Sequence, residues 1–482
     1  MFQYDFSNHQ NRHIQLKDMP EEYYDRILKT TKEDPFYPLW HIAPKCGLMN
    51  DPNGLFEADG VHHIFYQWFP AGPVHGLKHW YHLTTKDFIH YEDRGVGMYP
   101  DRPFDDHGCY TGMALTDGGK THIYYTGIEG EEQRPSTCHA LFDGGRIAER
   151  SCILPADPEL CTREYRDPFV FVRDGKYYML TGAQDRNEKG RLFFYEGEDP
   201  ERFSFRGCLD IGEYPFGYML ECPNYFERQD RGVLFFSPMG IEGENRYDFR
   251  NVFSVVYAVG EPLDTDAGSF SFERFYEMDK GFDFYAPQTY RDGQGRQLLF
   301  GWLGNSKSAY PTDGSNWAHM MTMPRELELE GDRLVQRPAK ELEALKGEAV
   351  PVTDGGSLSL SGGCAFALEG AAGERFWIEI GNEAGECVRF SGDDLEFCLD
   401  RSRMTFLYAE KFGTKRYAKR LEGTQEIRLW ADSSSLEIFA DGGKTVFTSR
   451  MFLEKPSYVK VSGFAGTFWK LGPIDLVYGT AR

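Results

Sequence analysis

The chain has 482 residues and a formal net charge of −22 at pH 7. A chain of this length can form two or three domains with substantial cores. The negative charge repels nucleic-acid phosphates and anionic membrane surfaces, and the sequence contains no block of Lys and Arg that would offset it. The composition therefore argues against nucleic-acid and membrane partners.

Aromatic residues are abundant, with 28 Tyr and 38 Phe, and they favour strands, so we expect an all-β fold. No apolar run approaches the roughly 20 residues of a membrane span, and the N-terminus lacks a basic start followed by an apolar segment. The ten cysteines show no zinc-ligand spacing. We therefore expect reduced thiols, no metal and a cytoplasmic protein.

Residues 1–36 are mostly polar. Within them, residues 21–28 (EEYYDRIL) fit a short amphipathic helix. We expect an N-terminal extension that docks onto the body of the protein.

A turn followed by an apolar, aromatic strand recurs five times between residues 37 and 330. The strands begin near residues 63, 122, 177, 233 and 298, so they are separated by 59, 55, 56 and 65 residues. Such spacing suits a four-stranded antiparallel unit with loops. The repeat predicts a five-bladed β-propeller over residues 37–330, and a large irregular β-sandwich is the alternative.

Residues 331–350 are charged and helix-prone, which predicts a linker or bridging helix. Beyond them, alternating segments such as 357–360, 376–380 and 426–430 are separated by Gly and Asp turns. This pattern is typical of a β-sandwich, which we expect over residues 351–482.

Three acidic motifs stand shortly before turns of the repeat: Asn50-Asp51-Pro52, Arg166-Asp167-Pro168 and Glu221-Cys222-Pro223. In a propeller the strand that leads into each hairpin is the innermost one, so these side chains would open onto one end of the central channel. Retaining glycosidases use a carboxylate nucleophile opposite a carboxylic acid, and a third carboxylate can support the cationic transition state. The motifs together indicate a sugar-cleaving enzyme.

Each motif has a plainer explanation when taken alone. The Asp51 motif could be only a turn, and Arg166 with Asp167 could be a surface ion pair. Glu221 follows the apolar Tyr218-Met219-Leu220, a setting that would favour the protonated form that a general acid requires.

Several motifs in order carry a family resemblance. They are residues 49–54 (MNDPNG), 65–67 (FYQ), 165–168 (YRDP), 221–223 (ECP), 283–288 (DFYAPQ), 323–327 (MPREL), 432–439 (DSSSLEIF) and 448–450 (TSR). From about residue 37 to residue 482 the chain resembles the invertases and fructan hydrolases, the β-fructofuranosidases of glycoside hydrolase family 32.

The resemblance implies a five-bladed propeller with a C-terminal sandwich and no metal or organic cofactor. It also implies that Asp51 is the nucleophile, Glu221 the acid/base and Asp167 the transition-state stabiliser, with Arg166 helping to keep Asp167 ionised. We expect the substrate pocket to include Asn50, Gln67, His75, Tyr110, Thr111, Arg166, Tyr285 and Trp302, with Cys222 supporting it.

Leu48, Tyr110-Thr111-Gly112 and His75 depart from the commoner family pattern, which affects the leaving-group side of the pocket. The stretch 72–80 (GPVHGLKHW) looks like that of intracellular sucrose and sucrose-6-phosphate hydrolases. Our hypothesis is that His75, Lys78 or His79 accepts a sugar phosphate, because a phosphate needs cationic donors. The alternative is that these are solvated residues at the pocket rim.

The sequence thus predicts a retaining β-fructosidase that acts on sucrose, its 6-phosphate or short fructooligosaccharides. The sandwich could pack on its own propeller or on a partner subunit, which leaves a homo-oligomer open. Two other functions stay open at this point: an inverting arabinan- or xylan-type propeller hydrolase and a noncatalytic glycan-binding propeller.

Overall fold

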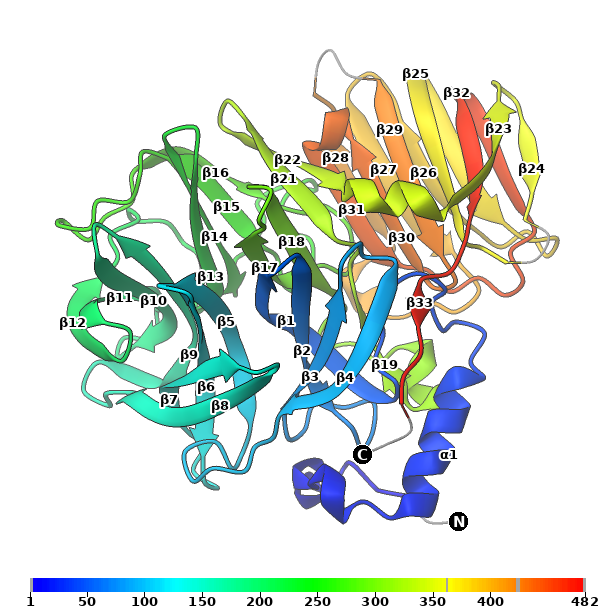
Figure 1. Cartoon of the computed structure of the whole chain (residues 1–482). Helices are drawn as coiled ribbons and strands as arrows, with labels where there is room; N and C mark the ends of the chain where they lie inside the picture. Colours follow the sequence, from blue (N-terminus) through cyan, green and yellow to red (C-terminus); the bar gives the residue numbers. More distant parts are fainter. Residues whose placement is uncertain (1–2, 361–362, 422–424, 480–482) are drawn as a thin grey trace.

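The computed structural model describes residues 3–360, 363–421 and 425–479, and it consists almost entirely of β-strands (Figure 1). A β-propeller is followed by a C-terminal, β-sandwich-like sheet. Within these residues, none of the helices has the length and apolar character needed to span a membrane.

The N-terminal segment contains two 3₁₀ turns and one α-helix: η1 (His9–His13), η2 (Leu16–Asp18) and α1 (Glu21–Lys32). The predicted amphipathic helix is confirmed, because Tyr23, Tyr24 and Ile27 are buried on one face. They belong to the same hydrophobic cluster as Trp68 and Tyr81 of the first propeller sheet. The segment is therefore packed against the propeller.

Antiparallel units of four strands follow one another along the chain. The first sheet contains β1 (Gly47–Ala58), β2 (Val61–Phe69), β3 (His79–Thr85) and β4 (His90–Met98), with β19 (Trp317–Ala318) beside β1 and β33 (Asp475–Leu476) beside β4. The second contains β5 (Cys109–Asp117), β6 (Lys120–Glu129), β7 (Arg134–Asp143) and β8 (Arg146–Pro155).

The next three sheets repeat this order. The third contains β9 (Cys161–Arg173), β10 (Lys176–Asp185), β11 (Gly190–Asp199) and β12 (Arg202–Cys208). The fourth contains β13 (Met219–Arg228), β14 (Arg231–Met239), β15 (Val256–Gly260) and β16 (Phe272–Glu277). The fifth contains β17 (Tyr285–Arg291), β18 (Gln297–Leu303), β21 (Arg325–Glu330) and β22 (Arg333–Pro338), with β20 (Met320–Met321) beside β18, and η3 (Pro311–Ser315) precedes β19.

The five strands predicted from the repeat are confirmed, since they are β2, β6, β10, β14 and β18, the second strand of each sheet. The Asp59-Gly60 turn has positive φ at both residues (53° and 74°), as the tight turn of a hairpin requires. The turn expected at residues 230–232 is centred instead on Gln229 and Asp230, both with positive φ. Gly232 is already in β14, opposite Glu227.

The first strand of each sheet lies at the centre of the propeller. In order around the centre, β1 contacts β5, β5 contacts β9, β9 contacts β13, β13 contacts β17 and β17 contacts β1. The ring of first strands is closed, so residues far apart in sequence meet at its end.

The fifth sheet continues one strand beyond the boundary expected at residue 330. β22 lies within the predicted linker, yet it pairs with β21 along its whole length, from Glu330–Arg333 to Arg325–Pro338. The segment was not recognised as a strand because its short apolar pair Leu334-Val335 is flanked by polar and charged residues, although Leu334, Val335 and Gln336 are all buried. The bridging helix is the short η4 (Lys340–Leu345).

The C-terminal domain is one ten-stranded sheet. Its strands are β23 (Lys346–Val352), β24 (Ser357–Ser359), β25 (Phe366–Gly381), β26 (Cys387–Gly392), β27 (Glu396–Arg403), β28 (Lys415–Lys419), β29 (Glu426–Asp432), β30 (Ser435–Ala440), β31 (Thr445–Arg450) and β32 (Tyr458–Leu471), with η5 (Glu410–Phe412) and η6 (Asp441–Gly443) between strands. The long strand β25 pairs with β29 in its first half and with β26 in its second. The single strand β25 therefore connects the part of the sheet that contains β29 with the part that contains β26.

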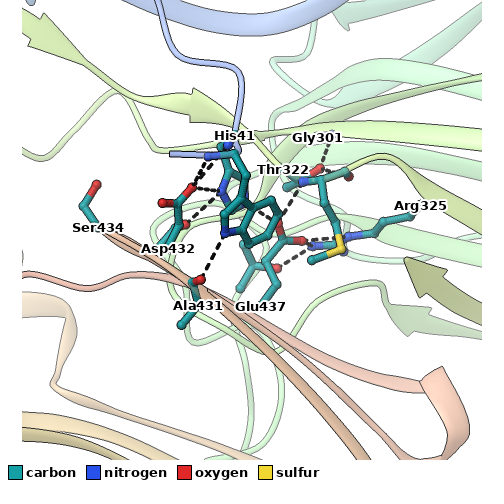
Figure 2. A network of polar contacts seen from close by, with 12 residues as sticks. His41, Gly301, Thr322, Arg325, Ala431, Asp432, Ser434 and Glu437 are labelled. Carbon is teal, nitrogen blue, oxygen red and sulfur yellow. Dashed lines mark hydrogen bonds and ion pairs between the residues drawn. The ribbon is translucent and has the colours of Figure 1, made fainter. Parts of the chain in front are cut away.

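A fully buried polar network fastens the propeller to this domain (Figure 2). The imidazole of His41 contacts Asp432 through Nδ1 (2.8 Å) and Glu437 through Nε2 (2.9 Å). The second oxygen of Glu437 accepts from Arg325 of β21. Side chains from the segment before β1 (His41), from the propeller (Arg325) and from the C-terminal sheet (Asp432 and Glu437) therefore contact one another directly and are fully buried.

Candidate active site

The first strands of the five sheets share a local irregularity. Each has a register shift near its start: after Met49 in β1, after Cys109 in β5, around Arg166 in β9, after Glu221 in β13 and after Tyr285 in β17. Four of the irregular stretches contain a proline, which is tolerated in a sheet at such bulges. A bulge re-aims the side chains next to it, and here it does so at the same end of every first strand.

Backbone strain accompanies the bulges. Asp167, Cys222 and Ala286, each directly before a proline, have φ of 64°, 49° and 44°. Non-glycine residues with positive φ cost energy and persist where the surrounding structure fixes them, which is frequent at functional sites. By position before the proline, Asp167 corresponds to Cys222, so Glu221 stands one residue earlier on its strand than Asp167 does.

The bulges surround a cavity of about 610 Å³. All three predicted carboxylates line it, as do all eight predicted pocket residues, namely Asn50, Gln67, His75, Tyr110, Thr111, Arg166, Tyr285 and Trp302. Cys222 lies beside the cavity, in contact with two of the carboxylates. The structure thus brings together the three carboxylates and the predicted pocket residues.

Asp51 is buried at the inner end of the cavity, and its carboxylate accepts hydrogen bonds from two side chains. Asn50 Nδ2 donates to Oδ1 (3.0 Å), and the Thr111 hydroxyl donates to Oδ2. Gln67 bonds both of these neighbours. Burial raises the pKa of Asp51, and the bonds from Thr111 and Asn50 oppose that shift without cancelling it.

Asp167 is the most enclosed of the three carboxylates. Its Oδ2 accepts from the backbone N–H of Cys222 (2.9 Å) and lies 3.5 Å from the Cys222 thiol. Burial raises the pKa of Asp167 to about 7, against the nearby positive charge of Arg166. The sequence-based expectation that Arg166 keeps Asp167 ionised is therefore too simple, because burial and the neighbouring carboxylates outweigh one guanidinium.

Glu221 is the partly exposed member of the three, with a side-chain exposure of 17%. Arg166 Nε donates to its Oε1 (2.8 Å), and the Tyr285 hydroxyl donates to its Oε2 (2.5 Å). The apolar setting expected from Tyr218-Met219-Leu220 is wrong, since the bulge turns Glu221 toward polar partners. Arg166 also bonds Glu164, so it pairs with two glutamates.

One wall of the cavity is aromatic. The rings of Trp302 and His75 lie 5.7 Å apart, and Tyr285 lies 6.1 Å from Trp302. Trp302 Nε1 and His75 Nε2 are buried and form no hydrogen bond with any described residue. These two nitrogens are placed to bond a polar ligand that occupies the cavity.

Lys78 lies inside the cavity rather than at its rim. Its Nζ donates to Asn50 Oδ1 (2.5 Å) and contacts His75 Nδ1 (3.0 Å). Burial lowers the pKa of Lys78 to about 7, and the charge of Asp51 opposes this. His79 is fully buried and bonds the Leu77 carbonyl, away from the cavity. Of the three residues proposed from sequence to meet a phosphate, His79 is therefore wrongly placed.

Sequence reasoning missed the contribution of the N-terminal segment. His9, Arg12 and His13 line the cavity together with His107 and Arg163. No local motif marked these residues, because their position depends on how the segment docks against residues 72–78. Among the described residues, no group of three or more His, Cys, Asp or Glu side chains is arranged to hold a metal ion.

A propeller with carboxylates at the end of its inner strands, joined to a sandwich-like domain, defines a class of sugar-cleaving enzymes. Two family models match this chain: the glycosyl hydrolases family 32 N-terminal domain over residues 41–338 and the family 32 C-terminal domain over residues 332–468. The chain belongs to glycosyl hydrolase family 32.

Individual relatives cover nearly the whole chain. The sucrose-6-phosphate hydrolase of Vibrio alginolyticus is 40% identical over 459 residues, which is 94% of each protein. The structure of sucrose-6-phosphate hydrolase from Lactobacillus gasseri superposes with a TM-score of 0.91 at 28% identity, over 97% of this chain and 99% of that one. A Bombyx mori GH32 β-fructofuranosidase superposes with a TM-score of 0.82 at 27% identity, covering 95% and 99%.

Proposed function

We propose that this protein is a retaining β-fructofuranosidase, which releases terminal β-D-fructofuranosyl units from sucrose, sucrose 6-phosphate or short fructooligosaccharides. The observation that carries the proposal is the meeting of Asp51, Asp167 and Glu221 around one cavity. Family membership and relatives named for this activity support it.

In this proposal Asp51 attacks the anomeric C2 of the fructosyl unit. The donors Asn50 and Thr111 stabilise its carboxylate form and hold it in one orientation. As the bond from Asp51 to C2 forms, the glycosidic C2–O bond breaks and the departing oxygen takes a proton from Glu221. A fructosyl-enzyme ester and a free leaving group result.

Water then completes the cycle. Glu221 removes a proton from water as its oxygen attacks C2, and the bond to Asp51 breaks, which restores both carboxyl groups. Glu221 suits this exchange because it is the partly exposed carboxyl group and lies between Arg166 and Tyr285. Asp167, behind it, would bond ring hydroxyls while positive charge develops on the sugar.

The inner end of the cavity suits a single furanose. Gln67 and Asn50 present amide groups beside Asp51, and Trp302 offers a flat apolar face with a free N–H. Such a mixture of one aromatic wall and a few convergent polar groups is typical of sugar pockets. We propose that these residues bind the fructosyl ring and that the leaving group extends toward the cavity mouth.

We also propose that the propeller has five blades and that the C-terminal domain is a β-sandwich. The closed ring of five first strands supports the count, and the shared strand β25 supports a folded-over sheet. The corresponding division is an N-terminal extension (1–36), a propeller from residue 37 to about residue 338 and a sandwich from about residue 346. A cytoplasmic location and a homo-oligomer stay predictions.

The decisive experiment is to incubate the protein with sucrose and follow the anomeric form of the released fructose by NMR. We expect β-fructofuranose as the first product, because two displacements at C2 retain configuration. Release of the α-anomer would contradict a retaining mechanism and favour an inverting hydrolase. Binding of sucrose without any hydrolysis would favour a glycan-binding propeller.

A further inference from the structure

The outer part of the cavity carries a cluster of basic side chains. His9 and His13 of η1 have ring centroids 5.4 Å apart, and His13 lies 5.3 Å from His107 on the loop before β5. Arg12 lines the same cavity. We name these four residues the basic rim. His9 is exposed whereas Asp51 is buried, so the rim stands at the mouth, outside the carboxylates.

The basic rim is held by its contacts with the propeller. The Arg12 carbonyl accepts from Leu77 N (2.7 Å), next to Lys78 on the same loop. A side chain at Gly76 would have its Cβ 2.6 Å from the Arg12 carbonyl oxygen, so glycine allows this close approach. On the other side, His107 N donates to Ile128 O (2.9 Å), and Asp106 fixes the His107 ring through Nδ1 (2.9 Å).

Hydrogen-bonding capacity remains free on the rim. His13 Nδ1 is buried and has no partner among the described residues. Arg12 uses only Nε, which donates to the Phe6 carbonyl (2.9 Å), and its two terminal nitrogens form no hydrogen bond or ion pair with the described part of the chain. Burial, His107 and His9 all lower the pKa of His13, with only Glu131 acting against them. An anion at this point would relieve that repulsion.

Resting on the proposed fructosidase function, we propose that the basic rim binds the phosphate group of a phosphorylated leaving-group sugar, with Arg12, His13 and His107 as its donors. An arginine and three imidazoles gathered at one point of a chain with net charge −22 suit a phosphate, which accepts charge-assisted hydrogen bonds from Arg and from protonated His. A neutral sugar would need no such group.

The inner basic residues are less suited to this role. Lys78 already bonds Asn50 and contacts His75, close to Asp51. A phosphate there would lie next to a catalytic carboxylate, and the two negative charges would repel each other. The leaving group departs from Glu221 outward, which directs its far end toward the basic rim.

Binding to the wild-type protein tests the proposal without turnover. We would titrate glucose 6-phosphate and glucose separately by calorimetry. Loss of hydrogen bonds to a charged group costs about tenfold or more in affinity, so we expect glucose 6-phosphate to bind at least about tenfold more tightly. Equal affinities would overturn the phosphate subsite even if sucrose is hydrolysed.

Variants then locate the subsite. We expect His13→Gln and His107→Gln each to reduce the ratio of kcat/KM for sucrose 6-phosphate to kcat/KM for sucrose by about threefold to tenfold, and the pair by more. His90→Gln is the matched control, since His90 is exposed on β4 and does not line the cavity, and it should leave the ratio unchanged. A ratio unchanged in the double variant would overturn the assignment.

The outcomes separate the two proposals. If the wild-type protein binds glucose 6-phosphate more tightly than glucose but hydrolyses neither sucrose nor sucrose 6-phosphate, the fructosidase proposal is wrong and the anion site stands. If it hydrolyses both sucroses equally well and the rim variants change nothing, the fructosidase proposal stands and the anion site falls.

Discussion

Two regions of this protein bury charged side chains, and they treat them in opposite ways. At the interface between propeller and C-terminal sheet, His41 bonds both Asp432 and Glu437, and Arg325 completes the set (Figure 2). In the cavity, three carboxylates face one another with Arg166 as the cation that pairs with Glu221.

The pKa shifts express this difference. At the interface burial works to raise the pKa of Asp432, but its bonds to His41 and backbone N–H groups lower it on balance. Burial would lower the pKa of His41, yet its two carboxylate partners raise it. In the cavity burial prevails, and the pKa of both Asp51 and Asp167 is raised. Buried charges that are fully paired hold a structure together, whereas underpaired ones keep protons available for chemistry.

The largest expected effect comes from Asp51→Asn. Loss of the attacking carboxylate should lower kcat on sucrose on the order of 10⁴-fold, as for other nucleophile removals. Because the raised pKa of Asp51 already favours a neutral group, the thermal unfolding midpoint should not fall. Residual activity above a tenth of wild type would contradict the nucleophile role.

Glu221→Gln should come next, with kcat on sucrose reduced about 10²- to 10⁴-fold, because sucrose has a poor leaving group that needs the proton. A substrate with an activated aryl leaving group should be affected far less. Glu164→Gln provides the control, since Glu164 bonds the same Arg166. Equal losses on both substrates would argue against an acid/base role for Glu221.

Glu437→Gln should destabilise the interface between the propeller and the C-terminal sheet without reducing the catalytic rate. Removing this charge leaves His41 and Arg325 buried beside a neutral amide. We expect a loss of about 3 to 5 kcal/mol in stability, with kcat of the folded protein nearly unchanged. Thermal unfolding and kinetics on the same sample check this. Glu426→Gln, an exposed carboxylate in the same sheet, should change neither.

Asp167→Asn should show that the stability contribution of a cavity carboxylate depends on pH in the opposite sense to that of an interface carboxylate such as Asp432. A raised carboxyl pKa means that the folded protein holds the proton more tightly, so this group's contribution is most favourable below about pH 4 and is lost as pH rises toward about 7. The variant should therefore be more stable than wild type at pH 8, by up to about 4 kcal/mol, and should lose this advantage at pH 4.

Asp432→Asn provides the matching comparison at the interface, with the free energy of unfolding of variant and wild type again measured at pH 8 and pH 4. Its lowered pKa gives stability that is present above the ordinary pKa of an aspartate and lost as pH falls. The destabilisation caused by this substitution should therefore shrink toward acidic pH. If both variants showed the same pH trend, the contrast between the two regions would be wrong.

Cys222→Ala should have the smallest effect. Asp167 is held by the backbone N–H of Cys222 at 2.9 Å, whereas the thiol is a weak donor at 3.5 Å. We expect kcat to change by less than about threefold. A much larger loss would show that the thiol itself orients the carboxylates.

Local patterns in the sequence determined much of this protein. Turn residues and aromatic runs predicted β2, β6, β10, β14 and β18, because hairpin turns and strand faces depend on side chains close in sequence. The same repeat predicted that Asp51, Asp167 and Glu221 would meet, since equivalent positions of a propeller face one channel.

Only the tertiary structure decided which charges pair. Arg166 was expected to serve Asp167, but the bulge at Glu221 directs the guanidinium to Glu221. The sequence left Lys78 open between a phosphate contact and a solvated rim residue, and it lies buried against Asn50. The N-terminal segment adds His13 to the cavity mouth. These contacts join residues on different strands and loops, and their energies depend on burial and packing, which no local pattern of side chains contains.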